Sequence, residues 1–327
     1  MHQLTINELG RAEMAWTGDK PWHGLGQQVQ RGASIEEWRQ AAGLEWSILR
    51  RPVRFNSSEE EGGDTLKLDG HDVLVRSDNL KGLSVVTKKY RVVQPDSVLE
   101  FFRDLTRSAG FQIETAGSMR EGRTIWVLAN TGLKQDIVPG DNVKGYLLLA
   151  TSYDSAIATT AMYTSTRVVC NNTLRFALNR DVESQVRIRH DAEFDPDVVK
   201  SQLGILAGES WSTFVTRMKS FSRTSMGSTE AGMVLAGVLA AQQAENVATI
   251  VTETRGYKKI MELFNGSGRG SEMSGVRNTA WGLVNAVTQY VDFERQARNN
   301  ETRLNSAWFG PGARLKDQIV SQLLELV

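Results

Sequence analysis

The polar residues best placed to do chemistry in this sequence lie in one short run near its middle. Arg167 and Arg175 flank two adjacent asparagines, Asn171 and Asn172, in the run Arg-Val-Val-Cys-Asn-Asn-Thr-Leu-Arg. The two asparagines lower the helix propensity of a segment whose apolar residues have helical spacing. They either cap neighbouring backbone or present hydrogen-bond donors and acceptors to a ligand, and the sequence leaves both interpretations open.

Basic residues also gather with aromatic residues on segments of β-strand composition. Such mixtures suit single-stranded nucleic acids, because cations contact the phosphates and aromatic rings stack on the bases. The candidate nucleic-acid-binding residues are Lys88, Lys89, Tyr90, Arg91, Arg120, Arg123, Trp126, Arg167, Asn171, Asn172 and Arg175. Further basic residues of this kind are Arg50, Arg51, Arg54, Arg187 and Arg189. The alternative is that the cations are solvated surface residues and that Trp126 belongs to the core.

The sequence contains no recognisable catalytic or metal-binding pattern. Its four histidines are far apart, and Cys170, its one cysteine, falls on the apolar face of a predicted helix, which favours a buried residue over a nucleophile. The run Gly266-Ser-Gly-Arg-Gly-Ser resembles a phosphate-binding loop only superficially, because no strand precedes it and no Lys-Ser or Lys-Thr pair follows. We therefore expect a non-enzymatic protein without cofactor or metal. An enzyme with an unfamiliar site is the remaining alternative.

The composition narrows the class of protein. Lys and Arg number 38, as do Asp and Glu, and this zero net charge argues against general polyanion binding but permits a local basic groove. A single cysteine allows no disulfide framework within the chain and fits a reducing cytoplasm. Because no stretch of about 18 apolar residues occurs, we expect no transmembrane helix and a cytoplasmic location.

Three strands followed by a helix are expected around the central run. The three strand segments are rich in β-branched and aromatic residues and are separated by turn residues. They are residues 123–130, 146–153 and 156–163. Cys170 and Leu174 recur at helical spacing, which predicts a helix over residues 167–178. This β-β-β-α order predicts an antiparallel meander with a helix docked on one face.

The flanking segments predict a β-rich first half and a helical second half. Residues 1–33 form a Trp- and Gly-containing strap, in which Trp22 and His23 either pack on the core or line a functional surface. Helices are expected at 34–42 and 95–109, and strands at 46–55, 72–76, 83–87 and 185–190. Later helices are expected at 196–222, 229–263, 274–298 and 312–326, with a flexible connector at about 265–271. The predicted fold class is α+β, with a β-rich domain over 1–193 and a helical region over 194–327.

Several separate motifs resemble one known family over nearly the whole chain. They are Pro21-Trp-His-Gly-Leu-Gly, Arg167-Val-Val-Cys-Asn-Asn-Thr-Leu, Thr279-Ala-Trp-Gly-Leu-Val-Asn-Ala-Val-Thr-Gln-Tyr-Val-Asp and Ser306-Ala-Trp-Phe-Gly-Pro-Gly. Together they are similar to the phage/plasmid-like proteins grouped as domain of unknown function 932. The resemblance implies an origin in a mobile genetic element and supplies no set of catalytic residues.

The β-β-β-α order also resembles the core of Rad52-like single-strand annealing proteins, whose markedly basic groove this neutral chain does not share. The principal hypothesis is a cytoplasmic, homo-oligomeric mobile-element protein that binds single-stranded DNA in recombination or replication, including strand annealing. Tyr90 and Trp126 would stack on bases, and the basic residues would contact phosphates. The alternative is a protein-interaction module whose helical half binds a host defence or replication protein.

Overall fold

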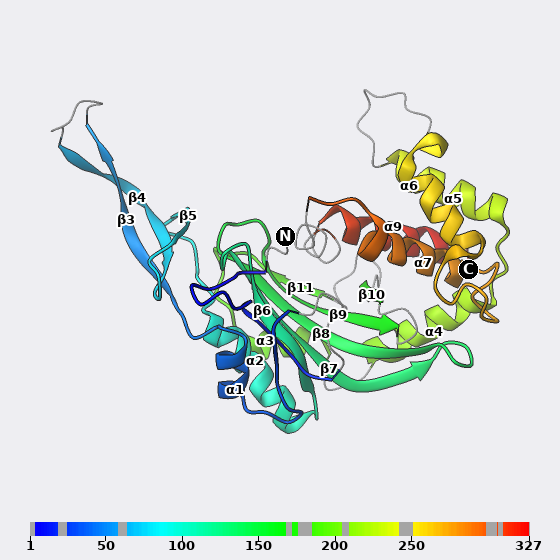
Figure 1. The fold of residues 1–327 in the computed structure, drawn as a ribbon, viewed down its shortest axis with the longest axis horizontal. Helices are drawn as coiled ribbons and strands as arrows, with labels where there is room; N and C mark the ends of the chain where they lie inside the picture. The colour runs from blue at the N-terminus through cyan, green and yellow to red at the C-terminus, as the bar shows by residue number, and fades with distance from the viewer. Residues whose placement is uncertain are drawn as a thin grey trace.

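The computed structural model describes residues 4–18, 25–57, 64–167, 172–175, 185–204, 209–241, 251–298, 306 and 310–326 of the chain. All strands precede residue 189, and all but two of the described helices follow residue 195 (Figure 1). The expected α+β class is therefore confirmed. Trp22 and His23 lie outside the described residues.

The larger sheet is almost entirely antiparallel. Its strands are β1 (Met14–Trp16), β2 (Gln27–Gln28), β6 (Gln112–Met119), β7 (Thr124–Asp136), β8 (Asn142–Ser152), β9 (Thr159–Arg167), β10 (Asn172–Arg175) and β11 (Gln185–Ile188). They are arranged in the order β10-β9-β8-β7-β6-β1-β2, and β11 also pairs with β9. Among the described strands, β1 and β2 form the one parallel pair. The predicted three-strand meander is present as β7, β8 and β9.

The helix predicted over residues 167–178 is wrong where the structure describes that range. Residues 172–175 form β10, which runs antiparallel to the end of β9 and places Asn172 opposite Arg167. Helical spacing over so few apolar residues does not distinguish a helix from a strand, and the neighbouring threonines and valines favour a strand. Asn171 and Cys170 lie outside the described residues.

Strand β6 was missed because a glycine interrupts its sequence pattern. Gly117 lies in the interior of the run Gln-Ile-Glu-Thr-Ala-Gly-Ser-Met, where glycine normally weakens a strand. A Cβ at Gly117 would lie 2.5 Å from the carbonyl oxygen of Glu13 and 2.8 Å from the ring of Trp126. The close approach of the N-terminal segment to β6 therefore requires this glycine.

Two helices, α1 (Ile35–Ala41) and α2 (Pro95–Ser108), match their predicted positions closely. Ser34 caps α1, because its hydroxyl accepts from the backbone N–H of Glu37 and the Glu37 carboxylate accepts from the Ser34 N–H. Helix α2 buries an apolar stripe and contacts β6 and β7, forming much of the core. The stripe consists of Val98, Leu99, Phe101, Phe102 and Leu105.

The smaller sheet extends into a projecting arm. It contains β3 (Ile48–Asn56), β4 (Thr65–Arg76) and β5 (Gly82–Thr87) in that order. Strand β5 pairs only with residues 71–75 of β4, so the outer parts of β3 and β4 form a two-stranded ribbon. We call residues 51–56 and 65–70 the arm; it projects from the body at the end opposite the C-terminal helices (Figure 1).

The described C-terminal half is helical, as predicted, but its helices are shorter than expected. They are α3 (Pro196–Gln202), α4 (Glu209–Arg223), α5 (Ser228–Ala241), α6 (Arg255–Glu262), α7 (Ala280–Gln289) and α9 (Pro311–Leu324), with single turns η1 (Val251–Glu253), η2 (Leu263–Ser267) and η3 (Tyr290–Glu294). In the predicted connector, the Ser271 hydroxyl donates to the Gly266 carbonyl at 2.8 Å, and the Arg269 N–H donates to the Gln289 side chain at 2.8 Å. The expected division at residues 193/194 stays a prediction.

Trp281 of α7 joins the helical half to the larger sheet. Its indole Nε1–H donates to Asp141 Oδ2 at 2.7 Å, in the turn between β7 and β8. Asp141 is fully buried and Trp281 is 1% exposed. A charged acceptor in such a site makes a strong hydrogen bond, and its removal leaves a buried donor without this partner.

Asp141→Ala is expected to lower the free energy of unfolding by about 1–3 kcal/mol, because the buried Trp281 N–H loses its acceptor. Urea unfolding followed by circular dichroism measures the change. The matched control is Asp136→Ala in the same hairpin, whose exposed carboxylate accepts from Asn142 Nδ2 at 2.9 Å. Equal effects of the two substitutions would contradict the assignment.

Candidate nucleic-acid interface

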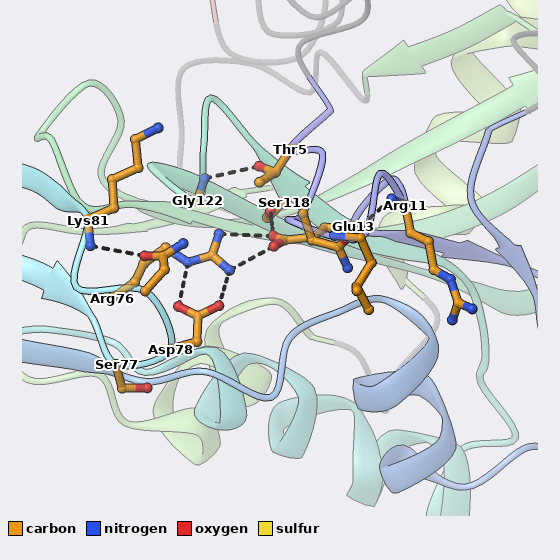
Figure 2. Close-up of polar contacts among 12 residues, drawn as sticks. Thr5, Arg11, Glu13, Arg76, Ser77, Asp78, Lys81, Ser118 and Gly122 are labelled. Atoms are coloured by element: carbon orange, nitrogen blue, oxygen red, sulfur yellow. Dashed lines mark hydrogen bonds and ion pairs between the residues drawn. The ribbon is translucent and has the colours of Figure 1, made fainter.

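Arg76, the last residue of β4, fixes the smaller sheet to the larger one. Its Nη1 and Nη2 donate to the Glu13 carboxylate at 3.1 and 2.7 Å, and its Nε and Nη2 donate to Asp78 at 3.0 and 2.7 Å (Figure 2). The Ser118 hydroxyl of β6 also donates to Glu13. Arg76 and Glu13 are 2% and 3% exposed, so each compensates the other's charge away from water.

An aromatic ring and a glycine pack against the Arg76 guanidinium. The guanidinium carbon lies 4.2 Å from the centroid of the Trp46 ring. Gly122 approaches from the turn between β6 and β7, where a Cβ would lie 2.9 Å from Arg76 Nη1. The positive φ of 91° at Gly122 independently favours glycine at this position.

The same turn carries two of the predicted phosphate contacts in an unusual backbone conformation. Arg120, Glu121 and Gly122 have φ angles of 55°, 62° and 91°, so three consecutive residues are left-handed. Non-glycine residues in this region cost of the order of 1 kcal/mol each and persist only where surrounding contacts hold them. One such contact is the Gly122 N–H, which donates to Thr5 Oγ1 at 3.0 Å.

Arg120 and Arg123 are both engaged in holding this turn. Arg120 forms an ion pair with Asp154, a residue that is 14% exposed. Arg123 Nε donates to the Leu83 carbonyl of β5 at 3.0 Å, and its Nη1 lies 3.7 Å from Glu121. These two arginines therefore bind the turn to its neighbours in this structure.

Lys88 is engaged with a carboxylate in the same way. Its ammonium group lies 2.6 Å from Asp72 Oδ1, while Arg50 Nη1 lies 3.0 Å from Oδ2 of the same residue. The hydrogen bond from Lys88 is the largest cause that holds the pKa of Asp72 below its ordinary value; burial opposes the shift, and Arg50 adds to it.

Both predicted stacking residues are buried. Trp126 is 1% exposed, and its Nε1–H points to Thr115 Oγ1 at 3.4 Å. Tyr90 is 7% exposed, its hydroxyl donates to the Ser152 carbonyl at 2.7 Å, and its ring stacks on His190 with a centroid distance of 4.5 Å. Neither ring has a free face for a nucleic-acid base in this structure.

The predicted residues do not form one cluster. Arg120 and Arg123 lie at the turn where β7 begins, next to the end of β8. Arg167 lies at the opposite end of β9, and Arg175 is paired nearby with Thr164. The length of β9 separates the two groups by roughly 26 Å, at about 3.3 Å per residue. The structure therefore brings Tyr90, Arg120 and Arg123 to one end of the sheet, and it places Arg167, Asn172 and Arg175 at the other.

One group of exposed cations lies on the smaller sheet and just after it. Within the described part of the chain, no carboxylate lies within ion-pair distance of Arg51, Arg54, Lys89 or Arg91, and all four are exposed. Arg91 also lines a pocket of about 580 Å³ at the base of the arm, together with Lys88.

The two faces of the arm have different chemistry. Arg54 lies directly opposite Lys67 in the β3–β4 ladder, and Phe55 lies directly opposite Leu66. Because directly opposed residues share a face and successive residues alternate, one face presents the two cations and the other presents the two apolar side chains. Phe55 is 49% exposed. It was overlooked in the sequence because it ends a predicted strand; its place beside a basic residue was the available signal.

The described ranges contain neither a candidate metal site nor a candidate membrane-spanning helix. No group of three or more His, Cys, Asp or Glu side chains there is arranged to hold a metal ion. No helix among those residues is long and apolar enough to cross a membrane.

Comparison with known proteins gives one match. A family model described as "Domain of unknown function (DUF932)" matches residues 82–308, which is more than two thirds of the chain. The match includes Lys89 and Arg91 but begins after the arm. Searches of curated proteins and of solved structures found no match.

Arg76→Met is expected to lower the free energy of unfolding by about 3–5 kcal/mol, because the carboxyl group of Glu13, which is 3% exposed, loses its buried partner. The double variant Glu13→Leu/Arg76→Met should lose less than the single variant, because no unpaired Glu13 charge remains. Chemical denaturation of the three proteins tests this. A double variant that is less stable than Arg76→Met would contradict it.

Lys88→Ala is expected to raise the pKa of Asp72 toward its ordinary value. Since the folded pKa is depressed, Asp72 contributes stability above about pH 3.9 that is lost as the pH falls through its folded pKa. In the variant, this acid loss should begin at higher pH. NMR titration of the Asp72 carboxyl carbon measures the pKa directly, with Lys89→Ala as control. An unchanged pKa in Lys88→Ala would refute the pairing.

Proposed function

This chain belongs to the family of domain of unknown function DUF932, and we propose that it is a non-enzymatic protein that binds single-stranded DNA along the arm. The observation that carries the proposal is the cross-strand pair Arg54 and Lys67. Like charges directly opposite each other destabilise a sheet, so a face that presents them favours an anionic partner. Lys67 is only weakly compensated, since its Nζ lies 3.9 Å from Asp69, whose side chain is 95% exposed.

The arm also carries an exposed aromatic ring, that of Phe55, whereas Tyr90 and Trp126 are buried. A DNA strand that follows the free outer edge of β3 would meet Arg54 on one face and Phe55 on the other. Its phosphates would contact the cationic face, and a base would stack on the exposed ring. Arg51, Lys89 and Arg91 extend the cationic surface toward the body. A sheet edge is suited to an extended ligand, since its backbone groups are unpaired.

The biological setting is part of the same proposal. The protein would act for a phage or plasmid in recombination or replication, in the cytoplasm and as a homo-oligomer, and strand annealing is the activity to test first. Arg167, Asn172 and Arg175 would require a second contact region at the far end of β9, and we place the primary contact on the arm instead. The alternative function, binding of a host defence or replication protein by the helical half, predicts no dependence on the arm.

Fluorescence anisotropy with a labelled single strand of about 30 nucleotides should show binding that weakens with salt. Arg54→Ala should lower the slope of log K against log salt by roughly 0.7, because one phosphate contact is lost. Phe55→Ala should weaken binding by about 1–3 kcal/mol through the loss of stacking. A duplex competitor should displace the strand poorly.

The matched control is Arg39→Ala, an exposed arginine whose guanidinium is paired with Asp96 at 3.1 Å. This variant should bind like the original protein. Thermal unfolding of Arg54→Ala should be unimpaired, since the substitution removes a repulsion. Salt-independent binding, or equal loss in Arg39→Ala and Arg54→Ala, would count against the arm.

A further inference from the structure

A second unbalanced pair of cations lies on the larger sheet, away from the arm. Lys134 of β7 is directly opposite Lys144 of β8, so both side chains leave the same face of the sheet. No described carboxylate lies within ion-pair distance of either lysine. Two opposed, uncompensated lysines are unfavourable in the free protein, and an anion bound between or beside them would relieve the repulsion.

Lys144 lines a pocket of about 280 Å³ next to this pair. Arg31 reaches the same pocket from the N-terminal segment and likewise has no carboxylate partner in the described part of the chain. A second pocket of about 370 Å³ shares Arg31 and Gln112 with the first and adds Arg107 of α2. Among the described residues that line the two pockets, Glu114 is the only carboxylate. The cavity is therefore polar, concave and positively charged.

Glu114 lines the first of these pockets and lies at a β-bulge of β6. Ile113 pairs with Ala129 and Thr115 with Leu128, so Glu114 is the extra residue of β6. Its carboxylate accepts from the Tyr146 hydroxyl at 3.1 Å and from Asn130 Nδ2 at 3.3 Å. Tyr146 and Lys144 are two residues apart on β8 and share a face, which places the fixed carboxylate on the lysine side of the sheet.

We propose that the pocket beside the β6 bulge, which is lined by Arg31, Glu114 and Lys144, binds a small phosphorylated molecule of about mononucleotide size. Lys144 and Arg31 would contact the phosphate group, which suits two cations that have no carboxylate partner among the described residues. The side chains of Gln112, Asn130 and Glu114 would accept from, or donate to, hydroxyl and amino groups of the rest of the ligand. The volumes of these two adjoining pockets, about 280 and 370 Å³, suit such a ligand, since small-molecule sites measure roughly 300–1,000 Å³.

The site is separate from the proposed DNA contact on the arm. Glu114, Asn130, Lys134 and Lys144 all lie inside the region matched by the family model, whereas the arm lies outside it. The phosphate recognised here has two sources, a free nucleotide or the 5′-terminal phosphate of a DNA strand. The chemistry is the same for both, and the experiment separates them.

Isothermal titration calorimetry of the full chain with thymidine 5′-monophosphate and with thymidine tests the proposal. The monophosphate should bind at least tenfold more tightly than the nucleoside. Lys144→Ala and Arg31→Ala should each weaken monophosphate binding at least fivefold, whereas Lys258→Ala, a control at an exposed lysine paired with Glu253, should leave it unchanged. Equal binding of nucleoside and monophosphate, or no effect of Lys144→Ala, would overturn the proposal.

Thermal unfolding separates binding from folding. Lys144→Ala should unfold at the same or a higher temperature than the original protein, because it removes a like-charge contact, and pyrophosphate should raise the unfolding temperature of the original protein only. A rise of the same size in Lys144→Ala would contradict the site.

Competition of thymidine monophosphate with a 5′-phosphorylated and an unphosphorylated oligonucleotide identifies the source of the phosphate. Displacement that requires the 5′ phosphate assigns the pocket to strand ends, and its absence assigns the pocket to free nucleotides. Arg54→Ala should weaken oligonucleotide binding without changing monophosphate binding. A failure of the arm and a failure of the pocket are therefore distinguishable.

Discussion

The ion pair between Arg76 and Glu13 is the contact on which the position of the arm depends. Each charge is almost completely removed from water, and the Glu13 carboxylate depends on Arg76 for its compensation, while Arg76 is also paired with Asp78. Three parts of the chain that are distant in sequence meet there: the N-terminal segment with Glu13, the end of β4 with Arg76, and β6 with Ser118 (Figure 2). A directional contact of this kind fixes orientation as well as proximity, which apolar packing alone does less well.

The basic residues at the sheet junction, on the arm and beside the β6 bulge fall into two groups, according to whether a carboxylate compensates their charge. At the junction of the two sheets, Lys88, Arg120 and Arg123 face Asp72, Asp154 and Glu121. On the arm and beside the β6 bulge, cations are instead set opposite cations, as in Arg54 with Lys67 and Lys134 with Lys144. The first group binds neighbouring elements together, and the second is the group that we propose contacts anionic ligands. This explains how a chain with no net charge can present local basic surfaces.

The sequence predicted the elements whose signals are local. Ser34 and Glu37 form the expected capping box, and the strands β7 to β9 follow their β-branched and aromatic composition. The sequence did not predict elements whose residue types are set by contact with a distant part of the chain. Strand β6 was missed because Gly117 interrupts its pattern. This glycine is required by the close approach of Glu13, which is about a hundred residues away in the sequence.

For the candidate site, the sequence identified the basic segments but not the partners of their side chains. Composition does not reveal that Arg120 meets Asp154, that His190 covers one face of Tyr90, or that Trp126 is buried. The pairing of Arg54 with Lys67 depends on an irregular register in the β3–β4 ladder, which shifts between Pro52 and Arg54 and follows no sequence rule.

Backbone hydrogen exchange with and without a saturating single strand of DNA tests the central claim most directly. The amides of residues 54–56 and 65–67 belong to a two-stranded ribbon with exposed edges, so exchange should be rapid in the free protein. The account predicts that DNA slows exchange there and in residues 88–91, with little change in α5 and α9. Protection confined to the C-terminal helices, or to the far end of β9 near Arg167, with no change in the arm, would contradict it.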